Sequence, residues 1–273
     1  MSPYTVFMDI DGTLVGHSQY PSKRVVDAIA KYRAQGHRFF IASGRPLFSA
    51  KFMADRIGPN LDIICSNGTV SRIDGKVEAK HLSTNALEGI WRVANKYDLA
   101  VHFFTLDKVL NFTPVVKEIS ADGKNRIAGE DPNNRIEIKT LEQLRAQSGK
   151  IINAIAIESD LEKVSRARVE MNTLTGVHAS SSNADNIEIT AHGINKAAAI
   201  TRVCQELNQP MSRTMAFGDG SNDLEMLKTV HYGVAMGNAN DEVKAATKFH
   251  TADLEHDGVA VALDKFLGRD EEE

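Results

Sequence analysis

The stretch Met8-Asp9-Ile10-Asp11-Gly12-Thr13 closes an apolar run near the N-terminus of the chain. Residues 4–8 predict a short buried strand that ends at two carboxylates two positions apart. Residues with this spacing share a face of a strand, and Gly12 lets the backbone turn away, so Asp9 and Asp11 can meet one ligand where the sheet opens. Two like charges this close require a shifted pKa or a bound cation. We expect a cation.

The alternative is a plain turn, because Asp and Gly are frequent in loops, or part of a calcium-binding loop. An EF-hand would continue with further oxygen ligands and a glutamate at its twelfth position. Here Leu14, Val15 and Gly16 follow instead. The rest of the chain decides between a site and a turn.

Length and composition limit the classes of protein. The chain has 273 residues, of which 42% are hydrophobic and 25% charged, as in globular proteins with one or two domains. A net charge of -4 argues against a nucleic-acid binder with a broad basic surface. No apolar run is as long as a membrane span, and no signal-peptide pattern is present. We therefore expect a cytoplasmic protein without nucleic-acid or membrane partners.

The two cysteines, Cys65 and Cys204, both lie in apolar contexts. This predicts buried small hydrophobic residues rather than a disulfide or a zinc site.

Short apolar runs alternate with amphipathic helical patterns at both ends of the chain. Strands are predicted over 4–8, 37–42, 61–65, 214–217 and 232–235, and helices over 23–35, 46–57, 195–207, 222–228, 241–246 and 258–266. Such alternation predicts an α/β fold, with a doubly wound, Rossmann-like parallel sheet whose site lies at the carboxyl ends of the strands.

The alternation breaks in the middle of the chain. A hairpin over 70–82 is followed by helices over 85–97, 141–147 and 161–174, with strands over 99–112, 151–157, 177–180 and 187–190. Paired strands separated by helices indicate an α+β domain. We predict an inserted α+β cap domain at 84–185 and a discontinuous core domain at 1–83 and 186–273.

A second acidic motif, Gly218-Asp219-Gly220-Ser221-Asn222-Asp223, also follows a predicted strand. If both strands lie in one sheet, Asp9, Asp11, Asp219 and Asp223 converge on one place. The result is a cation site made only of oxygen ligands, which suits Mg²⁺ best. By itself the second motif would be a capped turn with Asp223 in the first turn of a helix.

Two further residues suit phosphoryl transfer. Ser43, with Gly44 beside it, can bind phosphate oxygens through its hydroxyl and neighbouring N–H groups, and Lys196 can neutralise charge on a transferring group. A lysine at the start of a helix is more often solvated. The acidic motifs favour the functional interpretation.

In these motifs the chain resembles the haloacid dehalogenase-like phosphohydrolases of the Cof type, which carry a large cap. The resemblance spans the core in the expected order and covers the cap only by position, size and α+β pattern. The matching segments are Asp9-Ile10-Asp11-Gly12-Thr13-Leu14, Ser43-Gly44-Arg45-Pro46, Gly193-Ile194-Asn195-Lys196 and Gly218-Asp219-Gly220-Ser221-Asn222-Asp223, with Ser66-Asn67-Gly68 and Met236-Gly237-Asn238-Ala239 in addition.

The resemblance implies a role for each residue. Asp9 would be the nucleophile that forms an aspartyl-phosphate, and Asp11 the acid and base. Mg²⁺ would bind the Asp9 carboxylate, the Asp11 backbone carbonyl and Asp219, while Asp223 would hold metal-bound water or orient the site. The phosphate-binding residues would be Ser43, Gly44, Lys196, Asn222 and Gly12, with Asn67 at the rim of the site.

A cap that closes over the site controls access of water and contacts the leaving group. Substrate choice is therefore expected to depend on residues between 84 and 185. The polar and aromatic candidates are His102, Phe104, Arg126, Arg135 and His178.

We predict a magnesium-dependent phosphatase of small phosphomonoesters, with sugar phosphates as the first guess and nucleotide or cofactor monophosphates next. Three alternatives remain. A sugar phosphomutase would share the aspartyl-phosphate, a receiver domain would be phosphorylated only as a switch, and a binding module would hold metal or phosphate without turnover.

Overall fold

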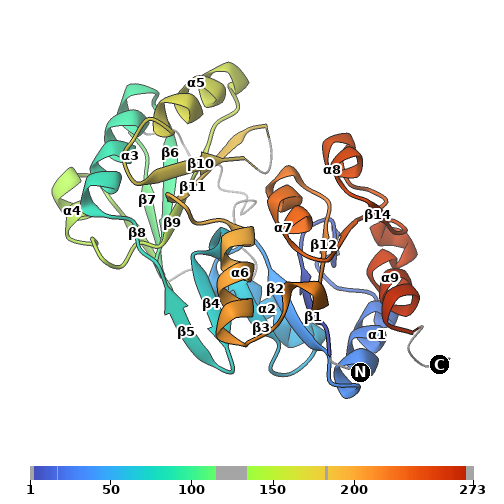
Figure 1. Cartoon of the computed structure of the whole chain (residues 1–273). Helices are drawn as coiled ribbons and strands as arrows, with labels where there is room; N and C mark the ends of the chain where they lie inside the picture. Colours follow the sequence, from blue (N-terminus) through green and yellow to red (C-terminus); the bar gives the residue numbers. More distant parts are fainter. Residues whose placement is uncertain (1–2, 17, 115–133, 182–183, 269–273) are drawn as a thin grey trace. The chain divides into compact units, whose positions relative to one another are not determined.

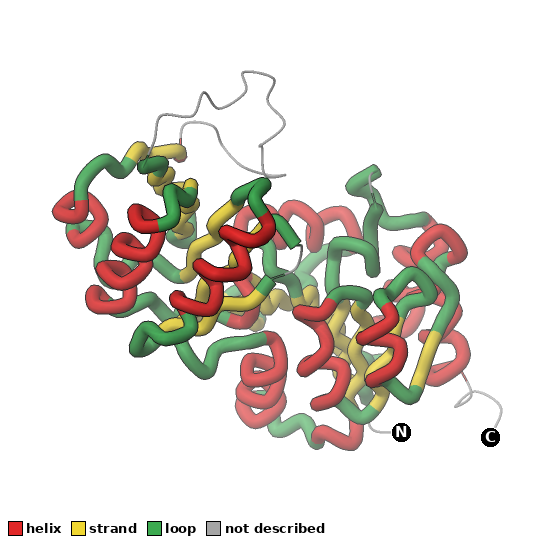
Figure 2. Tube along the Cα trace, turned by 90° about the horizontal axis from the view of Figure 1, so that it is seen from above, coloured by secondary structure: helices red, strands yellow, loops and turns green. Residues whose placement is uncertain are grey.

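The computed structural model describes residues 3–16, 18–114, 134–181 and 184–268. The chain divides into two compact units. Unit 1 comprises Met1–Gly44, Ala50–Val77 and Asn195–Glu273, and unit 2 comprises Arg45–Ser49 and Glu78–Ile194. Figure 2 shows helices beside the strands of both units. Unit 1 is thus formed by segments from both ends of the chain.

An eight-stranded sheet forms the centre of unit 1, in the order β14-β13-β12-β1-β2-β3-β4-β5 (Figure 1). All pairs from β14 to β3 are parallel, and β4 is antiparallel to β3. The strands are β1 Thr5–Met8, β2 Arg38–Ala42, β3 Asp62–Cys65, β4 Val70–Ile73, β5 Lys76–Ala79, β12 Thr214–Gly218, β13 Tyr232–Ala235 and β14 Phe249–His250.

The order of the strands determines where a site can form. From β1 the chain continues to β2 and β3, which extend the sheet in one direction. Later it continues from β12 to β13 and β14, which extend the sheet in the opposite direction. The strand order therefore reverses between β1 and β12, which is where ligands bind in open α/β sheets. Met8 of β1 is in register with Phe217 of β12. The segments that follow these two residues consequently leave the sheet side by side.

Side chains at the N-termini of two helices in unit 1 explain where these helices begin. Ser22 caps the first helix by accepting a hydrogen bond from the N–H of Val25, and Asn195 caps the helix that begins at Lys196 through the N–H of Ala198. The helices are α1 Lys23–Ala34, α2 Leu47–Ile57, α6 Lys196–Glu206, α7 Leu224–Thr229, α8 Asp241–Ala246 and α9 Gly258–Leu267. Apolar side chains of α6 and α7 share a core with Phe7 and Phe40 of the sheet. This packing fixes the start of α6 relative to the strand ends.

Unit 2 contains a six-stranded sheet in the order β10-β11-β9-β6-β7-β8. Its elements are α3 Thr84–Lys96, β6 Ala100–Phe104, β7 Val109–Phe112, β8 Arg135–Glu137, α4 Leu141–Arg145, β9 Asn153–Ile157, α5 Leu161–Met171, β10 Val177–Ser180 and β11 Asn186–Ala191. Alternate strand residues, such as Val101 and Phe103, pack in one core with Leu87 of α3 and Val164 of α5. The residues between them point to the opposite face.

The predicted fold class, a parallel α/β core with an inserted α+β segment, is confirmed. The structure differs from the sequence interpretation at the second boundary. The strand β11 pairs with β9 and β10, so unit 2 extends to Ile194 rather than ending at residue 185. The sequence shows that β11 is a strand but does not show which sheet it joins. The assignment of the two units as catalytic core and cap stays a prediction.

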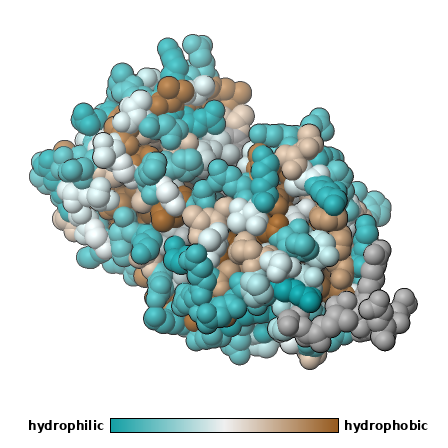
Figure 3. All heavy atoms as spheres, viewed as in Figure 1, coloured by the Kyte–Doolittle hydropathy of each residue, from teal (hydrophilic) through white to brown (hydrophobic). Residues whose placement is uncertain are grey.

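Among the described residues, no helix is long and apolar enough to span a lipid bilayer. Hydrophilic side chains predominate on the face of the molecule drawn in Figure 3.

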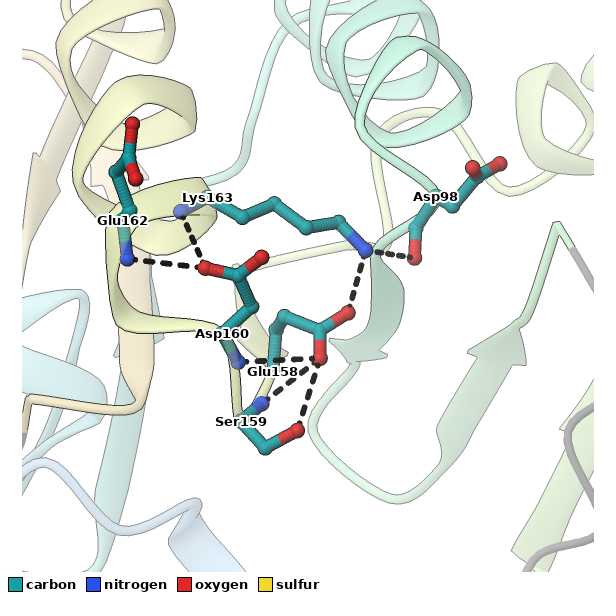
Figure 4. Close-up of polar contacts among 6 residues, drawn as sticks. All are labelled: Asp98, Glu158, Ser159, Asp160, Glu162 and Lys163. Atoms are coloured by element: carbon teal, nitrogen blue, oxygen red, sulfur yellow. Dashed lines mark hydrogen bonds and ion pairs between the residues drawn. The ribbon is translucent and has the colours of Figure 1, made fainter.

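A polar network fixes the start of α5 in unit 2 (Figure 4). Glu158 is buried, and its Oε1 atom accepts hydrogen bonds from the N–H groups of Ser159 and Asp160. Its Oε2 atom lies 2.6 Å from Nζ of Lys163, which also donates to the carbonyl of Asp98 at 3.3 Å. Asp160 caps α5 by accepting from the N–H groups of Glu162 and Lys163. A single buried carboxylate thus connects the end of β9 to the first turn of α5.

We predict that Glu158→Ala lowers the free energy of unfolding by about 1–3 kcal/mol, because buried N–H donors and the Lys163 ammonium lose their acceptor. Urea unfolding measures this loss. The control is Asp27→Ala, which removes a fully solvated ion pair with Lys23 and should cost about 0–0.5 kcal/mol. Equal effects of the two substitutions would contradict the role assigned to Glu158.

Candidate active site

The site forms where β1 and β12 end and α6 begins. Asp9 directly follows β1, and its N–H donates to the carbonyl of Phe217 in β12 at 3.1 Å. Asp219 directly follows β12, and Asp223 lies one turn further along the chain. Oxygen atoms of these three carboxylates lie within 4.8 Å of one another. The convergence predicted for Asp9, Asp219 and Asp223 is therefore present in the structure.

Lys196 lies at the centre of this acidic cluster. Its Nζ atom donates to Oδ1 of Asp9 at 2.6 Å and to Oδ1 of Asp223 at 2.5 Å. The lysine side chain is 1% exposed, so both ion pairs are shielded from water. Removing one member of such a buried group leaves an uncompensated charge, which is strongly destabilising. The lysine predicted to be a phosphate ligand thus also neutralises the nucleophile candidate.

Asp223 has a positional role that its place in the motif did not reveal. Its Oδ2 atom accepts hydrogen bonds from the N–H groups of Asp219 and Gly220, at 3.1 and 3.2 Å. Its Oδ1 atom accepts from Lys196. Both carboxylate oxygens are therefore occupied, one by the lysine and one by the turn that carries Asp219. Of the two roles considered for Asp223, this geometry favours orientation of the site.

Burial and mutual repulsion raise the pKa values of two carboxyl groups in this cluster. Burial raises the pKa of Asp9 well above its ordinary value, and the Asp223 carboxylate raises it further, although Lys196 opposes both. Burial, followed by the charge of Asp223, raises the pKa of Asp219 to about 6. One lysine therefore does not balance the charge of the cluster. A divalent cation would reverse this imbalance, and an oxygen-only donor set is what a hard cation requires.

Gly12 is required at its position for two reasons. Its φ angle is +82°, in the left-handed region, and a Cβ atom at this position would lie 2.1 Å from Oδ2 of Asp219. Thr13, the next residue, donates its hydroxyl to Oδ1 of Asp219 at 2.9 Å. The turn after β1 therefore holds the Asp219 carboxylate directly.

The remaining predicted site residues also lie in unit 1. Asp11 directly precedes Gly12 and is exposed. Ser43 follows β2, is buried, and donates its N–H to the carbonyl of Ile64. Gly44 lies against Asn67. Asn222 lies over Gly220, where a Cβ atom would be 2.7 Å from its Oδ1 atom. Their roles as acid, base and phosphate ligands stay predictions.

Two residues of unit 1 were missed as site residues. Thr13 supports Asp219, as described above. Asn238 donates its Nδ2 hydrogen to the carbonyl of Gly12 at 2.8 Å and accepts from the N–H of Leu254 through Oδ1. Asn238 lies three residues after the end of β13, the strand next to β12, and polar residues shortly after successive parallel strands were the available signal.

The candidates for substrate choice lie on the sheet of unit 2. His102 and Phe104 of β6, Arg135 of β8 and His178 of β10 alternate with residues of the helix-facing core, so all four point to the other face. Arg126 lies outside the described residues.

The same face carries a polar row. His102 contacts Oδ1 of Asn111 at 2.7 Å, and Asn111 donates to Glu137 at 3.3 Å. Asn153 of β9 was missed. Its side chain is buried, and its Oδ1 atom has no hydrogen-bond partner among the described residues.

The profile of the haloacid dehalogenase-like hydrolases matches residues 6–263. The chain belongs to this family, and the phosphatase class predicted from the sequence is confirmed.

Two curated relatives come from Bacillus subtilis, and both are 5-amino-6-(5-phospho-D-ribitylamino)uracil phosphatases. YcsE is 30% identical, with 94% of this chain and 93% of the relative covered. YitU is 27% identical, with 97% and 98% covered. Among solved structures, BT1666 from Bacteroides thetaiotaomicron, from a study of phosphatases of this superfamily, has a TM-score of 0.81 at 24% identity, with 97% and 95% covered. That likeness concerns the fold.

We predict that Asp219→Asn stabilises the metal-free protein at pH 7.5. The folded protein binds a proton at Asp219 with a pKa of about 6, against an ordinary value of 3.8. The unfolded chain has therefore lost this proton at a pH where the folded protein still holds it, and stability falls as the pH rises from about 4 to about 6. The asparagine avoids this loss, which amounts to about 1–3 kcal/mol.

Thermal unfolding in a chelator at pH 7.5 and pH 4.5 measures this difference. The gain should be present at pH 7.5 and should shrink at pH 4.5, where the wild-type carboxyl group is protonated in the folded state. An asparagine variant no more stable than the wild type at pH 7.5 would contradict the charge imbalance described above.

Proposed function

We propose that the protein is a Mg²⁺-dependent phosphatase of small phosphomonoesters that works through an aspartyl-phosphate on Asp9. The observation that carries the proposal is the buried ion pair of Lys196 with Asp9, beside Asp219 and Asp223. An ammonium group in contact with a carboxylate at the end of a central strand suits transfer of a phosphoryl group to that carboxylate, because it neutralises charge where the charge develops.

Asp9 acts as the nucleophile. Its Oδ1 atom is held by Lys196, and among the described residues no hydrogen-bond donor contacts its Oδ2 atom, which therefore attacks phosphorus. The bond between phosphorus and the leaving oxygen breaks, and Asp11 donates a proton to that oxygen. Water then attacks phosphorus while Asp11 accepts its proton. The bond between phosphorus and Asp9 breaks. Inorganic phosphate is released, and the free carboxylate of Asp9 is restored.

The other residues bind and orient. The phosphoryl oxygens are bound by the side chains of Lys196 and Ser43 and by the backbone at Gly44 and Gly12. Asn222 binds them at the edge of the site. Asp9, Asp219 and the backbone carbonyl of Asp11 would hold the Mg²⁺ ion, with Asp223 orienting the group. The bound ion supplies charge neutralisation for the phosphoryl oxygens and for the acidic cluster.

The substrates proposed are sugar phosphates first, and nucleotide or cofactor monophosphates next. The substrate named for YcsE and YitU carries its phosphate on a ribityl chain attached to a uracil ring. It thus combines a sugar-alcohol phosphate with a nucleobase, and it belongs in the test panel. We propose that unit 2 contacts the leaving group, and that the protein acts in the cytosol.

We predict that turnover requires a divalent cation. Phosphate release should be measured over a panel of sugar, nucleotide and cofactor monophosphates with Mg²⁺, and then after chelation and re-addition of the ion. Activity should disappear with chelator and return with Mg²⁺, because the acidic cluster repels an anionic substrate without it. Activity that survives chelation would overturn the metal role.

The same panel tests the alternatives. Steady release of phosphate without a bisphosphate activator excludes a phosphomutase. Absence of turnover on every phosphoester would favour a receiver or a binding module instead.

We predict that substitution of Asp9 and substitution of Asp11 lower kcat through the loss of different steps. Asp9→Asn should lower kcat by about 10³-fold or more, because no covalent intermediate can form. Asp11→Asn should lower kcat by about 10²–10⁴-fold through loss of proton transfer, while a burst of phosphoenzyme stays detectable with a substrate whose leaving group needs no proton. The control is Asp55→Asn on the exposed face of α2, which should leave kcat unchanged. Near-normal turnover of the Asp9 variant would refute the nucleophile assignment.

A further inference from the structure

The turn Ser66–Gly68 after β3 has an unusual backbone. Ser66, Asn67 and Gly68 have φ angles of 51°, 54° and 93°, all in the left-handed region. Within the described ranges, this is the one place where two neighbouring non-glycine residues both have positive φ. Such conformations are unfavourable for L-residues and persist only where the surroundings enforce them. The turn is buried, and its surroundings show what enforces it.

On one side the turn holds the segment after β2. The N–H of Asn67 donates to the carbonyl of Ser43 at 3.1 Å, while the N–H of Ser43 donates to the carbonyl of Ile64 at 3.0 Å. Both the N–H and the carbonyl group of Ser43 are therefore held by backbone hydrogen bonds. The Asn67 side chain lies against Gly44, where a Cβ atom would be 3.2 Å from its Oδ1 atom.

On the other side the turn contacts the start of α6. A Cβ atom on Gly68 would lie 2.4 Å from the carbonyl oxygen of Asn195 and 2.9 Å from Cβ of Ala199. Asn195 is the N-cap of α6, and the next residue is Lys196. The backbone of Gly68 therefore touches Asn195, the residue directly before the buried lysine, and a side chain at position 68 would displace it.

We propose that Ser66–Gly68 is a spacer that sets the distance between the Ser43 backbone and the Lys196 helix start, with Asn67 as its positioning residue. This assignment rests on the proposed function, in which Ser43 and Lys196 hold the same phosphoryl group. The two groups come from segments 153 positions apart and have no direct bond to each other in the described structure. A displacement of about 1 Å between such groups can cost about 10²-fold in rate.

The role of Asn67 in this spacer is carried by its backbone. Its contact with Ser43 is made by the peptide N–H, which every residue except proline possesses. Asparagine also tolerates the left-handed conformation, a property that glycine shares and alanine lacks. Substitution by alanine and by glycine thus separates backbone conformation from loss of the side chain.

The test uses inorganic phosphate as the probe, in the full chain with Mg²⁺. Asn67→Ala should raise the inhibition constant of phosphate, and KM with it, by about tenfold, because the N–H that holds Ser43 moves. Asn67→Gly keeps the left-handed turn and should change the inhibition constant by less than about threefold. Equal losses in the two variants would overturn the backbone role.

A matched control separates positioning from general stability. Asn208, which follows α6, has a φ angle of 52°, and Asn208→Ala imposes the same conformational cost away from the site. Both alanine variants should lower the melting temperature by about 2–6 °C. Only Asn67→Ala should change phosphate inhibition. A change of similar size in Asn208→Ala would show that the effect is global and would overturn the assignment.

The outcome also distinguishes this assignment from the proposed function. A wild-type protein that neither hydrolyses phosphoesters nor responds to phosphate would refute both. A wild-type protein that is active, with the same phosphate inhibition constant in Asn67→Ala, would refute only the spacer.

Discussion

The buried ammonium group of Lys196, held between the carboxylates of Asp9 and Asp223, is the interaction on which the site depends. Three carboxylates meet within a few ångströms at the end of a sheet, and a single lysine lies among them. Without it, the buried charges of Asp9 and Asp223 would repel one another with no counter-charge between them. With it, the cluster still holds three carboxylates against one ammonium group, and burial together with the Asp223 charge raises the pKa of Asp9 and of Asp219. A divalent cation could be held by these three carboxylates.

The order of the strands explains why residues from distant parts of the chain supply this cluster. Asp9 follows β1 and Asp219 follows β12, and the two strands are paired in register although more than 200 positions separate them. The strand order reverses between them, which leaves an opening at their carboxyl ends. Side chains from the turns fill it in a fixed arrangement, with Thr13 and Gly12 against Asp219 and Asn238 against Gly12. The turns thus restrain one another as well as the carboxylates.

The sequence predicted those parts of this arrangement that follow from the periodicity of apolar residues and from the position of the carboxylates after each apolar run. Carboxylates directly after apolar runs are visible as a pattern, and parallel strands bring their carboxyl ends to one edge. The bonds within the cluster were not visible, since the pattern does not show that Asp223 divides its two oxygens between Lys196 and the turn of Asp219.

The pairing of β11 with the sheet of unit 2 was also not visible, because an apolar strand carries no mark of its partners. The three left-handed residues at Ser66–Gly68 were missed for a related reason. Asn67 and Gly68 tolerate this conformation, but the contacts of the turn with Ser43 and Asn195, which accompany it, are not visible in the sequence.

The charge state of Lys196 restricts how protons can move in the proposed reaction. Burial lowers the pKa of this lysine, but the carboxylates of Asp223 and Asp9 more than offset burial and raise it above its ordinary value. The lysine therefore keeps its proton throughout and cannot act as the acid that releases the leaving group. Both carboxylate oxygens of Asp223 accept hydrogen bonds, and Asp9 is the proposed nucleophile. Asp11, which is exposed directly before Gly12, is the remaining carboxyl group of the opening motif, and in the proposed reaction it exchanges protons with water between the two half-reactions.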